Sequence, residues 1–131
     1  MKQSVRTGLL LTSALLMTFG AFGYALVLLP DLHGDLVEIG VRPTVLGATV
    51  RQLYFSAIAM FGFALMVSAA ALQAMRGLAL ARVPLGVVAL VNTIFGVMSF
   101  SETHSPHHLG PLLAGVLLGV ALVIRTQDGN R

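Results

Sequence analysis

The sequence predicts an all-α protein, an integral membrane bundle of four transmembrane helices with both termini in the cytoplasm. The chain of 131 residues is 56% hydrophobic and only 10% charged, and its mean hydropathy is +0.90. A soluble domain carries about 25% charged residues. Long apolar runs alternate with short polar stretches, and basic residues concentrate in every second polar stretch. The length suits a single domain, residues 1–131.

Four apolar segments have the length for a membrane span. They cover residues 8–29, 53–75, 79–101 and 107–125. A hydrocarbon core of about 30 Å needs roughly 20 helical residues, which the first two segments provide. The last two reach this length with their polar flanks. The first segment starts like a signal peptide, but its apolar run continues through residues 26–29, so we expect a retained span.

The basic residues set the orientation. One side holds six of them against a single carboxylate, Asp128; they are Lys2, Arg6, Arg76, Arg82, Arg125 and Arg131. The other side holds only Arg42 and Arg51, with four carboxylates. This bias predicts cytoplasmic termini in a bacterial inner membrane, with outer loops at residues 30–52 and 101–108. It also explains the pI of about 10.2 without a nucleic-acid partner.

The first outer loop has the pattern of a short amphipathic helix. Pro30 can open this helix and Gly40 can end it. At helical spacing one face collects the carboxylates and another the apolar side chains: Asp31, Asp35 and Glu38 against Leu32, Leu36 and Ile39. We expect the helix to lie in the headgroup region. The alternative is an acidic cluster that receives a cation.

All four histidines fall in the two outer loops: His33, His104, His107 and His108. With Glu102 they form a candidate site for Cu or Zn, because neutral imidazole and carboxylate are ligands for these metals. Solvated interfacial histidines and a pH-responsive outer face are the alternatives. The last span begins either at Ser105-Pro106, an N-cap followed by a first helical proline, or at Pro111.

A second candidate site combines Arg51, Tyr54 and Asn92. Arg51 and Tyr54 are three residues apart and share a helix face, which is typical of interfacial anchoring. If Arg51 instead points into the bundle, it lines a pocket for a small polar or anionic ligand. Asn92 is the one strongly polar residue near the middle of a span, so we expect it to hydrogen-bond to another helix. Its candidate partners are Ser13, Thr18, Ser56 and Ser68, or a backbone carbonyl.

Small residues at a spacing of four predict close helix packing. Gly115 and Gly119 form this pattern in the last span, and Gly77 predicts a helix stop after the second. The chain has no cysteine, and it has no recognisable catalytic motif. These features favour a non-enzymatic protein.

The order of features resembles the small four-span bacterial membrane proteins related to DoxX. The resemblance is carried by residues 30–40 after the first span, by the turn Arg42-Pro43-Thr44, and by Arg51 and Tyr54 at the start of the second span. An acidic residue often accompanies the arginine in that family, whereas Val50 and Gln52 flank it here. Some relatives are membrane subunits of quinone-linked oxidoreductases. The resemblance therefore implies a bundle that anchors or assists a partner.

Three functions follow from these patterns. The leading hypothesis is a non-catalytic subunit or scaffold of a membrane complex, with the lipid bilayer, other subunits or further copies of the chain as partners. The second is metal handling at the outer histidines. The third is an enzyme or carrier for a quinone-like or lipid-like molecule, using Arg51, Tyr54 and Asn92.

Overall fold

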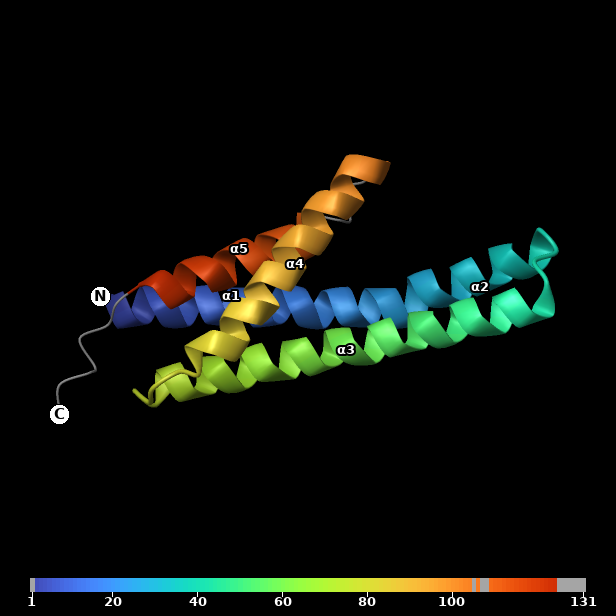
Figure 1. Ribbon diagram of the computed structural model, residues 1–131. Helices are drawn as coiled ribbons and strands as arrows, with labels where there is room; N and C mark the ends of the chain where they lie inside the picture. Colours follow the sequence, from blue (N-terminus) through green and yellow to red (C-terminus); the bar gives the residue numbers. More distant parts are fainter. Residues whose placement is uncertain (1, 105, 107–108, 125–131) are drawn as a thin grey trace.

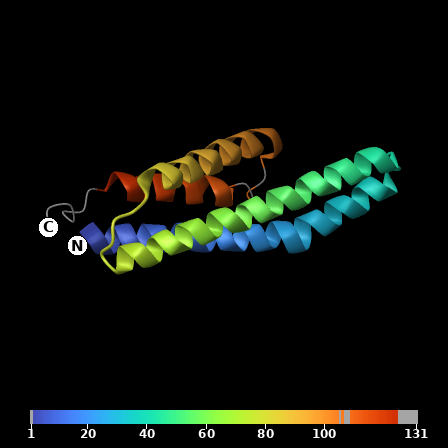
Figure 2. The ribbon, with the colours of Figure 1, turned by 60° about the horizontal axis from the view of Figure 1, so that its bottom comes forward.

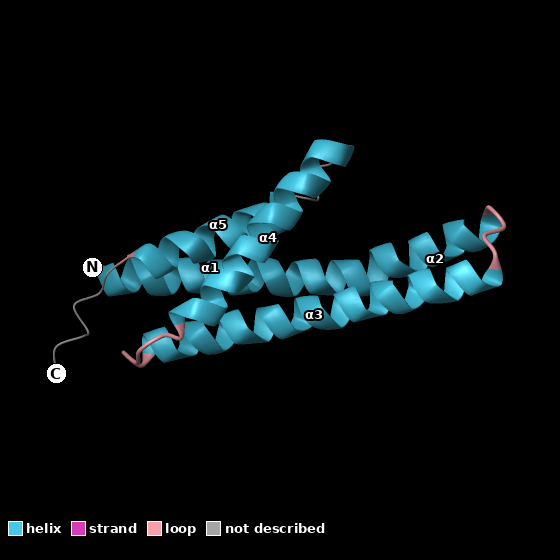
Figure 3. Ribbon diagram, in the orientation of Figure 1, coloured by secondary structure: helices cyan, strands magenta, loops and turns pink. Residues whose placement is uncertain are grey.

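The computed structural model describes residues 2–104, 106 and 109–124, and these form an all-helical chain without strands (Figure 3). The elements are α1 (Lys2–Gly23), the π-helical segment η1 (Tyr24–Leu28), α2 (Leu29–Glu38), α3 (Pro43–Met75), α4 (Arg82–Thr103) and α5 (Leu109–Val123). Three helical segments are long and apolar enough to cross a membrane, and α5 is a shorter apolar helix. The architecture is that of a membrane protein.

The first three elements form one uninterrupted helical rod. It runs from Lys2 to Glu38 over 37 residues, about 55 Å at 1.5 Å per residue. Its π-helical segment lies just before Pro30. Proline has no N–H to donate, and its ring collides with the carbonyl four residues earlier, that of Leu26. The wider π-helix accommodates this defect, so Pro30 bends the rod without ending it (Figure 1).

The second long helix, α3, runs back along this rod (Figures 1 and 2). Around the π-helical segment the two are joined by specific contacts. The rings of Phe22 and Phe61 meet edge to face, with their centroids 5.0 Å apart. The side chains of Tyr24 and Ser56 also interact. These contacts hold the irregular part of the rod against α3.

The stretch 30–52, expected as an outer loop, is mostly helical. Only residues 39–42 leave the helices. Gly40 has a φ of +73°, and the N–H of Val41 bonds to the Leu36 carbonyl at 3.2 Å, which closes α2 with the turn that its glycine predicts. Helix α3 then starts at Pro43, ten residues or nearly three turns before the expected span. We call residues 30–52 the hairpin tip; it projects beyond α4 and α5 (Figure 2).

The apolar stripe of α2 packs in part on α3. Leu32 and Leu36 are partly buried, and α2 contacts the first turns of α3. Ile39, the third residue of the predicted stripe, is 74% exposed because the helix has already ended there. The predicted helix therefore exists, but it continues the axis of α1 as one arm of a two-helix hairpin.

The helices pack in the order α3, α1, α5, α4. Helix α4 contacts mainly α5, α5 contacts α1, and α1 contacts α3, whereas α3 and α4 hardly touch. Each of the four contributes a fully buried residue: Leu10, Val67, Val88 and Leu118. Figure 1 shows α4 crossing α1 obliquely, with its far end leaning away from α3. The arrangement is an open row, and we call the space between α3 and α4, which contains a small hollow floored by α1 and α5, the cleft.

Two glycines bring α4 and α5 into close contact. A Cβ atom on Gly115 of α5 would lie 2.5 Å from Thr93 Oγ1 and 2.7 Å from the Ala89 carbonyl oxygen. A Cβ on Gly96 of α4 would lie 2.6 Å from the backbone nitrogen of Leu112. The packing predicted for Gly115 is thus found within the chain, while Gly119 faces open space and the role of Gly96 was not anticipated.

Helix α3 stops where Gly77 predicts it. Gly77 has a φ of +71°, its N–H bonds to the Ala74 carbonyl at 3.1 Å, and the N–H of Leu78 bonds to the Gln73 carbonyl at 2.9 Å. This pair of bonds is the glycine-dependent helix end expected from the sequence. Helix α4 begins at Arg82, three residues later than the predicted span.

Candidate functional site

The most distinctive polar position lies at the cleft between α3 and α4. A small hollow opens there, lined by Leu16, Met17 and Gly20 of α1, Met60 and Phe63 of α3, Asn92 of α4 and Pro111 of α5. Its enclosed volume is about 20 Å³, room for a single water molecule or one methyl-sized group. Ligand pockets hold about 300–1,000 Å³. The hollow therefore accepts part of a side chain but not a whole small molecule.

Asn92 is the only amide in the lining of this hollow. Its Nδ2 donates to the Val88 carbonyl oxygen of its own helix at 2.9 Å. The structure gives no other hydrogen bond to this side chain from the described residues, so its oxygen remains available. The side chain is only partly buried. A hydrogen-bonding group thus faces the open cleft from the eleventh residue of a 22-residue helix.

Within the described part of the chain, Asn92 bonds to a backbone carbonyl of its own helix, whereas the expected bond was to another helix. Three of the proposed hydroxyl partners donate elsewhere: Ser13 to the Ala114 carbonyl at 2.8 Å, Thr18 to the Ala14 carbonyl at 2.8 Å, and Ser56 to the Gln52 carbonyl at 3.0 Å. The bond from Ser13 is fully buried and joins α1 to α5. A buried polar cross-link between helices is therefore made by Ser13, which was considered in the sequence only as a partner for Asn92.

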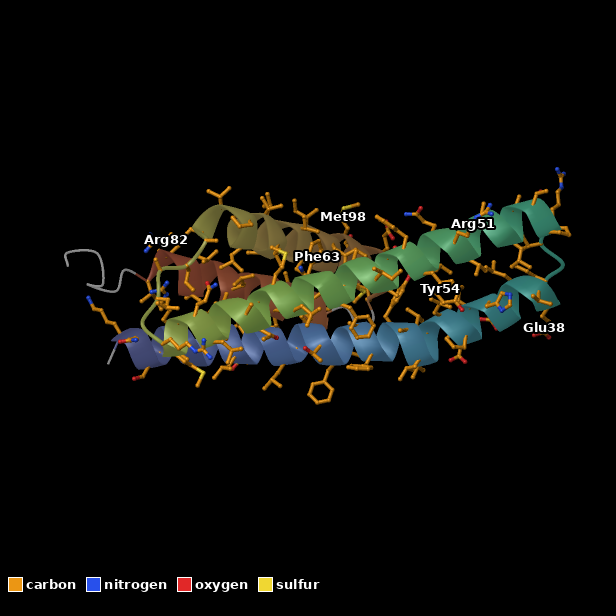
Figure 4. The ribbon with its side chains drawn as sticks, turned by 90° about the horizontal axis from the view of Figure 1, so that it is seen from below. Glu38, Arg51, Tyr54, Phe63, Arg82 and Met98 are labelled. Carbon is orange, nitrogen blue, oxygen red and sulfur yellow. The ribbon has the colours of Figure 1, made fainter. Side chains whose placement is uncertain are left out.

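Arg51 and Tyr54 lie away from the hollow that contains Asn92. Both are on the part of α3 that runs beside α2 and η1 (Figure 4). Arg51 is exposed, and Tyr54 is 56% exposed. Met60, the nearest lining residue of α3, is nine residues beyond Arg51, about 13 Å along the helix axis. The three residues predicted as one pocket are thus divided between the edge of the hairpin tip and the cleft.

The proposed metal ligands are only partly within the described residues. His107 and His108 lie outside them, so their part in the site has no structural description. His33 and Glu102 are exposed, on α2 and α4 respectively. On α2, His33 is two residues from both Asp31 and Asp35 and so points away from the acidic face. In residues 2–104, 106 and 109–124, no three His, Asp or Glu residues are grouped to hold a metal ion.

His104 has an evident structural role. It follows the last residue of α4 with a φ of +52° and ψ of +19°, the left-handed conformation. Its N–H bonds to the Phe100 carbonyl at 2.9 Å, and its ring lies beside that of Phe100, with centroids 6.0 Å apart. Glycine usually occupies this position at a helix end, and histidine tolerates it better than most residues. His104 is therefore a helix cap.

One charged residue is buried where the sequence predicted a membrane flank. Arg6 on α1 is only 6% exposed. Nearby, the Gln3 side-chain amide donates to the Ala74 carbonyl at 3.3 Å, which ties the start of α1 to the end of α3. Hydropathy alone gave no sign of this burial, because a flanking arginine is normally solvated.

No family model, curated protein or solved structure matches this chain. The geometry of the helices and the positions of their polar groups are therefore the basis for the function proposed below.

Proposed function

We propose that this chain is a non-catalytic integral-membrane subunit that packs against another membrane-embedded chain. In this proposal α1, α3, α4 and α5 all cross the bacterial inner membrane, with both termini cytoplasmic. The observation that carries it is the open row of helices, which leaves the cleft between α3 and α4 uncovered with the Asn92 amide facing it. A polar group at this depth is costly against lipid and favours contact with a neighbouring helix.

The size of the hollow supports this function over that of a carrier or enzyme. A quinone-like or lipid-like substrate needs a pocket of several hundred Å³, and the enclosed space here is about 20 Å³. Arg51 and Tyr54, the groups meant to bind its polar end, are exposed on a separate part of α3. The exposed Arg51 and Tyr54 fit the interfacial anchoring that their spacing favours.

The hairpin tip is consistent with a role in assembly. If the membrane core covers the apolar parts of α1 and α3, residues 30–52 extend about 15 Å beyond it on the outer side. Asp31, Asp35 and Glu38 are all exposed there. The resemblance to proteins related to DoxX, some of which are membrane subunits, points in the same direction.

Native mass spectrometry of the protein released gently from its own membrane tests this function. We expect a complex that contains at least one further protein chain, either another copy or a different subunit. A denaturing detergent is the control, because it should reduce the complex to the 13.8 kDa chain. A lone chain after gentle release would contradict the proposal, whether bare or carrying a metal ion or small organic molecule.

A further inference from the structure

We infer that the cleft between α3 and α4 receives α4 of a second copy of this chain, with the two Asn92 carboxamides hydrogen-bonded to each other across a two-fold axis. This inference rests on the proposed function and specifies its partner. It starts from the two features that meet at the cleft, namely the poor contact between α3 and α4 and the position of Asn92 beside the hollow.

The first step is the energetic cost of the amide. Asn92 lies halfway along α4, so it is near the middle of the bilayer if α4 crosses it. Within the described part of the chain, its only hydrogen bond is the one from Nδ2 to Val88. The oxygen and one N–H are left facing hydrocarbon, which cannot bond to them. A partner that supplies both a donor and an acceptor removes this cost.

The size of the hollow limits which group of a partner can occupy it. The enclosed space of about 20 Å³ excludes a free ligand, but it suits one projecting group from a neighbouring helix. Met60 and Phe63 of α3 line one side of the hollow and Asn92 the other. Figure 4 labels Phe63 on α3 and Met98 on α4, the two helices that border the cleft. The group that occupies the hollow is therefore a side chain of a neighbouring helix.

The third step identifies that helix. A carboxamide carries donors and an acceptor, so two identical amides that face each other satisfy both with two reciprocal hydrogen bonds. A two-fold interface brings each residue opposite its own copy. Both copies insert in the same orientation, so the axis follows the membrane normal and the two α4 helices meet in parallel. A single asparagine plays this part in parallel coiled coils, where it fixes register and the number of strands.

The absence of cysteine makes this arrangement directly testable by cross-linking. Phe95 is 48% exposed and lies one turn beyond Asn92 on the same face of α4, so Phe95→Cys should form a disulfide-linked dimer in membranes under mild oxidation. Leu90 is 60% exposed on the opposite face of α4. Leu90→Cys is the matched control and should stay monomeric on a denaturing gel. Equal cross-linking of the two variants, or none from Phe95→Cys, would overturn the inference.

A second pair of variants tests the amide itself. Asn92→Leu keeps a similar volume and raises helix propensity, so α4 should still form. We expect it to weaken self-association of the full chain roughly tenfold, measured by dilution in detergent micelles or lipid. Asn92→Gln retains an amide and should retain more of the dimer than Asn92→Leu. A dimer unchanged by Asn92→Leu contradicts the inference.

The failure of this inference and that of the proposed function have different signatures. If native mass spectrometry finds a different protein and one copy of this chain, the subunit function stands and the self-association is wrong. If it finds a lone chain, both fail. If it finds two copies that depend on Asn92, both are supported.

Discussion

His104 ends α4 in a backbone conformation that few residues other than glycine adopt. At a φ of +52° the Cβ atom of His104 causes steric strain, and glycine, which has no Cβ, would avoid this strain. His104, one of the proposed metal ligands, therefore has a structural role, since its backbone N–H bonds to the Phe100 carbonyl at the end of α4. The cap and a ligand role make different predictions for the same substitution.

His104→Gly should raise the free energy of unfolding by about 1 kcal/mol, because glycine adopts this conformation without strain. Thermal unfolding in detergent micelles measures the change. His33→Gly is the control, since His33 lies within the exposed α2 helix, where glycine should lower stability by a few tenths of a kcal/mol. Lower stability of the His104 variant would contradict the cap.

The buried bond from Ser13 to the Ala114 carbonyl joins α1 to α5. Ser13→Ala should therefore lower the free energy of unfolding by about 1 kcal/mol, in the range found for hydrogen bonds between membrane helices. Thr12→Ala is its neighbour and control. Thr12 is exposed and bonds only to the Gly8 carbonyl of its own helix, so its loss should be nearly neutral. Equal effects of the two substitutions would show that the α1–α5 bond contributes no stability.

At the scale of the elements, the helices and their ends were largely predictable. Gly40 and Gly77 stop α2 and α3 where their residue type predicts, because both positions need a positive φ. The continuity of α1 into α2 was not predictable from hydropathy, which reports the surroundings that a residue tolerates and not whether its helix continues. Pro30 was interpreted as a helix start, but a π-helical segment absorbs it. For the same reason the hairpin tip was expected as an outer loop with one short separate helix and not as a continuation of two long helices.

The contact between α4 and α5 depends on glycine at one position and not at its neighbour. A Cβ on Gly115 meets Thr93 and the Ala89 backbone at 2.5–2.7 Å, whereas Gly119 has nothing within 4 Å. Gly115→Ala should lower the free energy of unfolding by about 1–3 kcal/mol through overpacking. Gly119→Ala should leave it unchanged or raise it slightly. Thermal unfolding of the two variants side by side measures the contrast, and similar results would contradict this packing.

At the scale of the whole molecule, the sequence indicates an apolar helical protein but not the order in which its helices pack. That order depends on which surfaces fit, such as Gly96 against Leu112 and Gly115 against Thr93, and such fits depend on three-dimensional shape. The candidate site shows the same limit. Asn92 was singled out correctly as unusual, but the cleft beside it comes from the failure of α3 and α4 to meet. No periodicity in the sequence encodes that failure.

The proposed orientation predicts a cytoplasmic C-terminus. Alkaline phosphatase fused there should be inactive and green fluorescent protein should fluoresce, because each reporter works on only one side of the bacterial inner membrane. The same reporters inserted after Gly40, in the turn of the hairpin tip, should give the opposite result. Phosphatase activity at the C-terminus would reverse the assignment that the charge bias predicts.

The described helix α5 has 15 residues, about 22 Å, while the rod beside it is about 55 Å long. The apolar part of the rod ends near Leu29, before the charged hairpin tip, but it is still longer than described α5. Lipids that meet α5 must shorten by several Å or cover its polar flanks, at a cost of fractions of a kcal/mol per Å. If α5 crosses the bilayer as proposed, we expect the protein to thin the bilayer around this helix and, in a membrane of mixed thickness, to gather where the bilayer is already thin.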